Sequence, residues 1–99
     1  MIQLVWEFIV RPDDIREFET HYSSGGTWAE LFRKSAGYRG TVLWRDATAR
    51  CHYLAVDSWE SAAAHAEMET KFYREYEELD RACMAFTESE KNLGAFEVT

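Results

Sequence analysis

The chain has 99 residues, with 18 acidic and 11 basic side chains and a formal net charge of −7. This length suits one domain, which we expect to span residues 1–99. The negative charge repels phosphate backbones and anionic lipid surfaces, so neither nucleic acid nor a membrane is an expected partner. A domain of this size buries only about 60 to 65% of its unfolded surface, so association with a second copy would add stability.

The pattern of apolar and cysteine residues excludes further classes of protein. The opening run Met1–Val10 is interrupted by Gln3 and Glu7 and lacks a basic start, so it is not typical of a signal peptide. No stretch is apolar over the length that a membrane-spanning helix needs. Two cysteines, Cys51 and Cys83, are too few for a disulfide framework or a zinc site. We therefore expect a cytoplasmic protein with reduced thiols.

The first expected element is a strand over Ile2–Val10, whose side chains alternate between two faces. One face carries Leu4, Trp6 and Phe8, and the other carries Val5, Glu7 and Ile9. Because both faces are largely apolar, we expect this strand to lie at the centre of a sheet.

Two helices are predicted before the next strand. The first begins at Pro12, which needs no amide donor in a first turn and precedes two acids that the helix dipole favours. Its buried stripe consists of Ile15, Phe18 and Tyr22. Residues 23–26 break this helix, and the capping-box spacing of Thr27 and Glu30 predicts a short second helix. That helix would carry inward the side chains of Trp28, Leu31 and Phe32.

The middle of the chain predicts a β-hairpin. Strand patterns over Gly37–Asp46 and Cys51–Trp59 follow one another closely. The five residues 46–50 form a loop of suitable length to join them. These two strands are therefore expected to pair with each other.

A long helix and a final strand are predicted after the hairpin. A second capping-box spacing, from Asp57 to Glu60, precedes the stretch Ala62–Phe86, which contains neither glycine nor proline. We expect this stretch to be helical, with a bend near Thr70. A weaker strand pattern over residues 92–98 closes the chain.

The order strand, helix, strand, strand, helix, strand is that of the ferredoxin-like βαββαβ unit, an α+β fold with a four-stranded antiparallel sheet. Such a unit covers only one face of its sheet with helices. The other face needs a cover of its own. We therefore expect a homodimer that pairs through the open sheet face and forms a two-chain α+β barrel, with Trp6 or Trp44 facing either the partner chain or a ligand.

Three segments carry a resemblance to a known family. They are VWEFIVRP (residues 5–12), GGTWAELFRKSAGYRGTVLWRD (residues 25–46) and YLAVDSWES (residues 53–61). In order and spacing they resemble the antibiotic biosynthesis monooxygenases, small proteins that form a dimeric α+β barrel. The resemblance implies that fold over nearly the whole chain. The family includes oxygenases that act on quinols or aromatic polyketides without metal or flavin, haem-degrading enzymes, and many members of unknown role.

The haem-degrading branch is not expected here. Its members resemble one another in an asparagine on the first strand, a tryptophan at the start of the second long helix, and a histidine about ten residues further on. Only the tryptophan is matched, by Trp59, because Glu69 falls near the histidine position and His65 lies one helical turn too early. The chain also lacks the ligand spacing of a metal site and a glycine-rich phosphate loop. We therefore expect neither cofactor nor metal.

His52 is the candidate catalytic base. A cofactor-free oxygenase needs a base to ionise a phenol or enol, an apolar cavity, and donors that stabilise the resulting anion. His52 lies in an otherwise apolar strand, and histidine titrates near neutral pH. The alternative is a strand histidine that faces solvent or is satisfied by a backbone group. His21 and His65 are weaker candidates, because both have polar neighbours on predicted helices.

Tyr76 is the candidate donor, and Trp28, Trp59 and Tyr73 are candidate substrate-binding residues. Tyr76 shares a helix face with Asp80, and Tyr73 lies one turn earlier, so these phenols could donate to a ligand oxygen. The alternative for Tyr76 is a half-buried core position. Trp28 could belong to a lid over the sheet or to a plug that completes the core, and Trp59 could close a pocket or pack the helix start.

Two functional hypotheses follow. The first is a cofactor-independent monooxygenase that acts on an aromatic, polyketide or quinol-like small molecule. The second is a non-catalytic dimeric small-molecule-binding or regulatory module of the same fold. The residues leave open whether the chain is an enzyme. A deep cavity lined by His52 together with a tyrosine or arginine would favour the first hypothesis, and a fully packed sheet face would favour the second.

Overall fold

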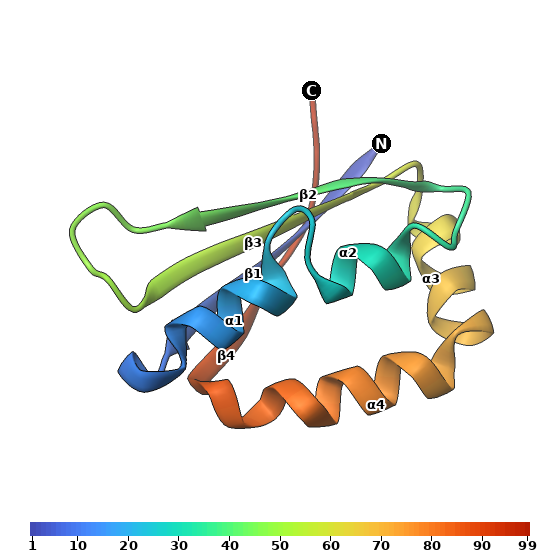
Figure 1. Cartoon of the computed structure of the whole chain (residues 1–99). Helices are drawn as coiled ribbons and strands as arrows, with labels where there is room; N and C mark the ends of the chain where they lie inside the picture. The colour runs from blue at the N-terminus through green and yellow to red at the C-terminus, as the bar shows by residue number, and fades with distance from the viewer.

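The computed structural model describes residues 1–99 and has the expected order of strands and helices (Figure 1). Its elements are β1 (Ile2–Val10), α1 (Ile15–Tyr22), α2 (Thr27–Phe32), β2 (Tyr38–Arg45), β3 (His52–Trp59), α3 (Ala62–Lys71), α4 (Tyr73–Cys83) and β4 (Thr87–Glu97), with 3₁₀ turns at Pro12–Asp14 and Met84–Phe86. The long helix predicted after the hairpin is interrupted at Phe72, close to the bend expected near Thr70. None of the helices combines the length and the apolar character needed to cross a bilayer.

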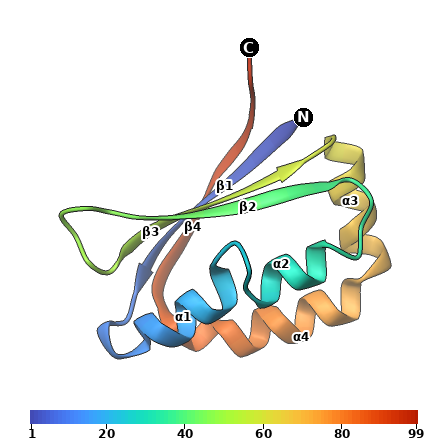
Figure 2. The same cartoon turned by 45° about the horizontal axis from the view of Figure 1, so that its top comes forward.

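The strands form one antiparallel sheet in the order β2-β3-β1-β4, with β1 at its centre as its two apolar faces predict. All the helices lie on the same side of this sheet (Figures 1 and 2). The ferredoxin-like α+β class and the four-stranded antiparallel sheet are therefore confirmed. The other side of the sheet is not covered by any part of the chain.

The last strand is longer than expected. β4 begins at Thr87, whereas the sequence pattern placed the strand over residues 92–98. The first half of β4 carries mostly polar side chains, as an edge strand can. Backbone hydrogen bonds with β1, and not the burial of side chains, hold this half in the sheet. Register shifts occur at two points of this pairing, and Gly94 near one of them has a φ of 115° that suits glycine. A periodicity pattern does not detect a strand of this kind.

The helix caps also differ from the predicted ones. Thr27 is not a cap, because the capping position is Gly26, and the Thr27 hydroxyl lies 2.9 Å from Nδ1 of His21. The cap of α3 is Ser61, whose Oγ accepts a hydrogen bond from the Ala64 amide at 3.1 Å. Asp57 is therefore not part of a capping box. It lies within β3 and is available for another role.

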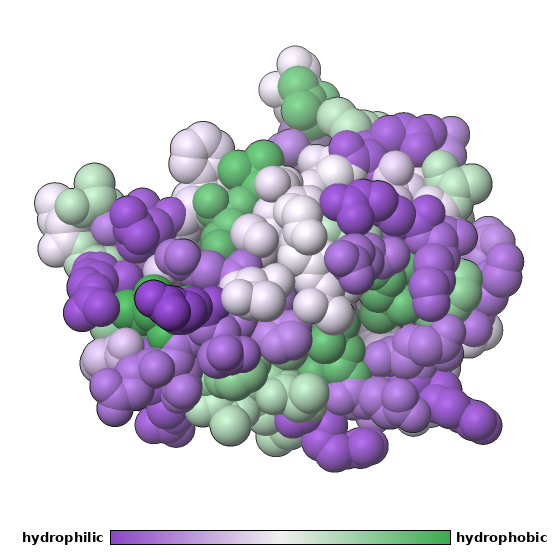
Figure 3. All heavy atoms as spheres, in the orientation of Figure 1, coloured by the Kyte–Doolittle hydropathy of each residue, from purple (hydrophilic) through white to green (hydrophobic).

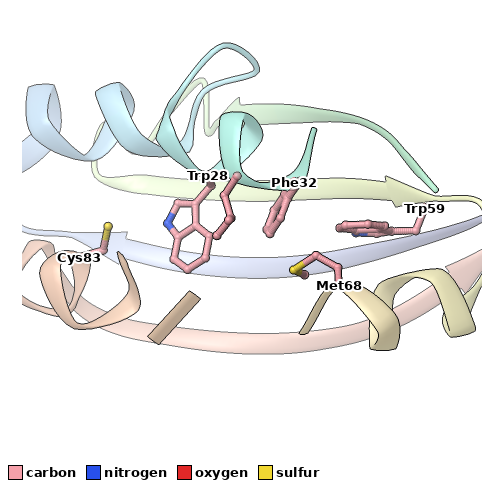
Figure 4. Packing of buried hydrophobic residues seen from close by; sticks show 6 residues of the cluster. Trp28, Phe32, Trp59, Met68 and Cys83 are labelled. Carbon is pink, nitrogen blue, oxygen red and sulfur yellow. The ribbon is translucent and has the colours of Figure 1, made fainter. Parts of the chain in front are cut away.

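The core between the helices and the sheet has two parts. One part lies under α2, α3 and α4 (Figure 4) and consists of Trp28, Leu31, Phe32, Trp59, Met68 and Cys83. The other lies under α1 and consists of Phe8, Val10, Phe18, Tyr53 and Ala55. Both parts contact Tyr22 and Phe86, so the two halves of the helical layer are packed against shared residues.

Gly26 is required by a close approach of the backbone. A Cβ at this position would lie 2.6 Å from the carbonyl oxygen of Thr20 and 2.7 Å from that of His21, and neither carbonyl can rotate away. We expect Gly26→Ala to lower the free energy of unfolding by about 1–3 kcal/mol, as overpacking does. Gly25→Ala is the matched control, because nothing lies within 4 Å of its Cβ position. Chemical denaturation of both variants would measure this, and equal stabilities would contradict it.

The uncovered side of the sheet, here called the open face, is apolar along its middle. Val5 pairs in register with Val56, and Val56 with Val42, so their side chains point to the same side. The apolar residues of the open face are Val5, Ile9, Val42, Trp44, Leu54, Val56 and Phe96. Trp44 is 59% exposed and Phe96 is 52% exposed, which is unusual for large apolar side chains that lie on one surface.

Candidate functional site

A cavity of about 70 Å³ lies between the sheet and the helices that cover it. Most of its wall is aromatic, with rings from Trp6, Phe8, Tyr22, Trp28, Phe32 and Tyr76. The rest of the wall is formed by Thr41, Ala55, Asp57, Asp80 and Glu90. These residues come from all four strands and from α1, α2 and α4, so the cavity exists only in the folded chain.

The volume limits what the cavity can hold. A buried water needs at least about 10–15 Å³, so there is room for roughly five waters. A cavity of about 150 Å³ holds benzene, so a single ring would lie partly outside the enclosed space here, and a molecule with several fused rings would project further from it. A shallower hollow of about 450 Å³ opens along the edge of β2. Thr41 lines both this hollow and the cavity, so the two adjoin each other at this residue.

Asp57 is the carboxylate that β3 turns toward the helices, on the same side as Ala55 and Trp59. The Thr41 hydroxyl donates a hydrogen bond to its Oδ1 at 2.6 Å, and the Tyr38 hydroxyl lies 2.6 Å from the Thr41 oxygen. Because Thr41 gives its only proton to Asp57, Tyr38 donates to Thr41. Burial raises the pKa of Asp57 to about 6, and the Thr41 hydrogen bond opposes this rise only in part. Such a carboxylate can accept and return a proton near neutral pH.

Two further carboxylates, those of Asp80 and Glu90, line the same cavity. Neither they nor Asp57 takes part in an ion pair. Burial, and after it the charge of Asp80, raises the pKa of Glu90. No lysine, arginine or histidine lines the cavity, which is therefore acidic as well as aromatic. No group of three or more His, Cys, Asp and Glu side chains is placed to hold a metal ion.

One hydrogen-bond donor of this site is the Tyr76 hydroxyl. Burial, followed by the charge of Glu69, raises the pKa of Tyr76 to about 12, so this hydroxyl stays protonated. Nε1 of Trp28 is buried without a hydrogen-bond partner, and because it is closed to water it does not open onto the cavity. Figure 4 shows the Trp28 nitrogen on the side of the ring that faces Cys83 on α4.

The structure brings together only two of the five site residues expected from the sequence. Trp28 and Tyr76 both line the cavity, with their rings in edge-to-face contact at a centroid distance of 5.0 Å. Trp59 is fully buried in the core and does not reach the cavity. Tyr73 is 64% exposed on α4. His52 lies on the open face, on the other side of the sheet.

Sequence reasoning missed Asp57 as a site residue. The signal was present, because Asp57 interrupts the alternating face formed by Tyr53, Ala55 and Trp59. A carboxylate on the buried face of a strand is costly unless it is functional or paired. The spacing to Glu60 had instead suggested a helix cap, a role that belongs to Ser61.

His52 is held by two carboxylates on the open face. Its Nε2 lies 2.8 Å from Glu7 and its Nδ1 lies 2.9 Å from Asp46. The hydrogen bonds to Asp46 and then to Glu7 raise the pKa of His52, and the same contact lowers the pKa of Asp46 to about 2. The histidine is therefore stabilised as a cation next to the apolar residues of this face, and its geometry is that of an ion-pair network.

This network predicts a pH-dependent contribution to stability. Because the pKa of His52 is raised on folding, its contribution is complete below the ordinary value of 6.5 and is lost as the pH rises through the raised value. We expect His52→Gln to lower the thermal midpoint at about pH 6 and to have less effect at about pH 9, because the contribution of the charged histidine declines as the pH rises through its raised pKa. Thermal unfolding at both pH values would measure this. A larger effect at the higher pH would contradict the ion-pair network.

Solved structures share this fold at low sequence identity. A mutant of SnoaB, a cofactor-independent oxygenase from Streptomyces nogalater, matches with a TM-score of 0.82 and 20% identity, over 98% of this chain and 91% of that chain. A protein from Nitrosomonas europaea, provisionally named an antibiotic biosynthesis monooxygenase, matches with a TM-score of 0.73 and 11% identity, over 99% and 98% of the two chains. Another structure, named an antibiotic biosynthesis monooxygenase, has a TM-score of 0.65, 14% identity, and coverage of 100% and 99%.

No family model matches the chain, and no curated protein matches it. The structural matches therefore establish the ferredoxin-like α+β fold of the single chain, which the resemblance to the antibiotic biosynthesis monooxygenases implied. At identities of 11–20% they show nothing more than the fold. What this chain does has to be argued from its own cavity.

Proposed function

We propose that the protein oxygenates a small, single-ring phenol or quinol with dioxygen and without a cofactor. The observation that carries this proposal is Asp57, a carboxylate of raised pKa in a cavity walled by aromatic rings. In this role Asp57 is the base, and Tyr76 donates a hydrogen bond to the oxygen that becomes negative. The fold shared with SnoaB, a protein described as a cofactor-independent oxygenase, supports the same class of activity.

The proposed reaction converts one phenol and one dioxygen into one para-quinone and one water. Asp57 takes the proton of the phenol hydroxyl, and the ring carbon opposite that hydroxyl bonds to dioxygen. Asp57 then returns the proton to the terminal oxygen of the peroxide. Loss of water removes the hydrogen from that carbon, breaks the O–O bond and leaves the second carbonyl. The electrons lost by the ring are those that reduce dioxygen, so no other reductant is needed.

We also propose that two chains pair through the open face to form a barrel. The exposed Trp44 and Phe96 would be covered in such a dimer, and the exposed apolar area of the monomer would disappear. The free thiols of Cys51 and Cys83 suit the reducing, cytoplasmic location expected from the sequence.

A non-catalytic binding module is the second candidate function. It is favoured by the charge of the cavity, since Asp57, Asp80 and Glu90 line it and no basic side chain does. A phenolate formed there would be stabilised only by Tyr76 and would be repelled by the remaining carboxylates. In this case the aromatic walls would hold a ligand without changing it.

Oxygen uptake separates the two candidates. The purified protein would be mixed with a panel of single-ring phenols and quinols in an oxygen electrode, with the products collected under isotopically labelled dioxygen. The expected result is a protein-dependent uptake and a quinone that carries one labelled oxygen. If ligands bind but no member of the panel consumes oxygen above the protein-free rate, the binding module is the better description and the oxygenase proposal fails.

A further inference from the structure

We propose that the cavity selects a phenol that also carries a protonated amine. This inference rests on the proposed function, because it names the substrate class of the same site. Its first support is the set of unpaired acids. Asp57, Asp80 and Glu90 line the cavity without an ion-pair partner from the chain. Unpaired carboxylates at a half-enclosed site favour a ligand that brings a positive charge.

The aromatic wall gives a second, independent support. Trp6, Tyr22, Trp28 and Tyr76 all line the cavity. Ring faces attract cations, most strongly for tryptophan, and the attraction grows as the cation loses water. A wall of rings next to carboxylates is therefore suited to an ammonium group and poorly suited to a carboxylate or phosphate.

The Tyr76 hydroxyl supplies the other half of the recognition. Tyr76 lines the cavity, and burial keeps its hydroxyl protonated. A protonated hydroxyl can donate a hydrogen bond to an acceptor oxygen of a ligand. A phenol that also carries an amine offers both an acceptor oxygen for Tyr76 and a cation for the carboxylates.

The amine also removes a difficulty of the proposed reaction. Ionising a neutral phenol would add a negative charge beside Asp80 and Glu90, which disfavours the phenolate. An ammonium group on the same molecule offsets that charge. Glu90 is exposed, so the cavity reaches solvent on its side and leaves room for a short amine-bearing arm beyond the ring. The face of the molecule drawn in Figure 3 carries many hydrophilic residues around its margin, and the net charge of −7 attracts cations to the protein.

A matched pair of ligands tests the proposal. The probes are 3-(aminomethyl)phenol, which is a cation at neutral pH, and 3-ethylphenol, which has the same shape and no charge. Binding is measured by calorimetry without oxygen and at about 0.15 M salt, where nonspecific attraction by distant charges is screened. We expect the amine to bind at least about tenfold more tightly than the ethyl compound.

Variants locate the source of the preference. In the double variant Asp80→Asn, Glu90→Gln the amine and the ethyl compound should bind with nearly equal affinity. Glu67→Gln is the matched control, because it removes an acid exposed on α3 outside the cavity, and it should keep the preference. Loss of the preference in the Glu67 variant would assign it to the overall charge of the protein and would overturn the proposal.

Other results also overturn it. They are equal or tighter binding of 3-ethylphenol by the unaltered protein, binding of the anion 3-hydroxybenzoate as tight as that of the amine, and no binding of either probe. Oxygen uptake with the same pair keeps the two proposals apart. An amine that binds preferentially but consumes no oxygen leaves the amine preference standing and removes the oxygenase. Oxygen uptake that is as fast with 3-ethylphenol as with the amine leaves the oxygenase standing and removes the amine preference.

Discussion

Replacement of Asp57 by asparagine is expected to slow the proposed oxygenation by about 10²- to 10⁴-fold, which is the usual contribution of a general base. The amide oxygen can still accept the hydrogen bond from Thr41, but it does not take up a proton at neutral pH. Because the pKa of Asp57 is about 6, the rate of the unaltered protein should rise as the pH passes through that value and then level off. Oxygen uptake at several pH values would measure both effects, and Asp57→Asn should lack the rise.

The same substitution carries its own control for folding. The pKa of Asp57 is raised on folding, so its contribution to stability is complete below the ordinary value of 3.8 and is lost as the pH rises through about 6. At neutral pH the ionised carboxylate therefore weakens the fold, and Asp57→Asn should be at least as stable as the unaltered protein. A lower thermal midpoint for the variant would show that Asp57 has a structural role that the cavity does not explain.

His52→Gln is the informative comparison for this prediction. His52 was the base expected from the sequence, but it lies on the open face and the sheet separates it from the cavity. We expect its replacement to retain most of the oxygenation rate. If His52→Gln instead lost the activity and Asp57→Asn kept it, the base would be His52 and the cavity would not be the reaction site.

Substitution of Trp44 by glutamate is expected to dissociate the proposed dimer. Trp44 is a large apolar side chain that is 59% exposed in the single chain, in the row of apolar residues along the open face. Buried tryptophans at interfaces commonly contribute about 2 kcal/mol or more, which corresponds to a dissociation constant weakened by roughly 30-fold. A buried glutamate adds the cost of removing a charge from water. Native mass spectrometry should show twice the 11.6 kDa chain mass for the unaltered protein and the single mass for Trp44→Glu.

The chain offers a closely matched control for this experiment. Tyr73 is also a large aromatic residue and is 64% exposed, but it lies on α4, far from the open face. Tyr73→Glu adds the same charge and should leave the dimer intact. A monomeric unaltered protein would contradict the proposed barrel, and dissociation by both variants would place the contact on another surface or assign it to overall charge.

The candidate site was only partly predictable from the sequence. Trp28 and Tyr76 stood out because they are aromatic residues on helix faces with inward periodicity, and both line the cavity. Asp57 was not predicted as a site residue because its spacing to Glu60 matches a capping box. The spacing alone does not distinguish a helix cap from a residue within the preceding strand. His52 stood out by residue type alone, yet alternation along β3 places it on the opposite side from Asp57.

The sequence by itself determined the order of elements, the class of fold and the central position of β1. These depend on local periodicity, on the two apolar faces of one strand and on breaks at glycine, all of which are properties of neighbouring residues. Only the tertiary structure decided which carboxylate lies half-buried beside the aromatic rings. That outcome depends on the register of β3 against β1 and β2, and on the path of α4 across the sheet. A shift of one residue in a strand exchanges its two faces, so the chemistry of the site is a long-range property of the fold.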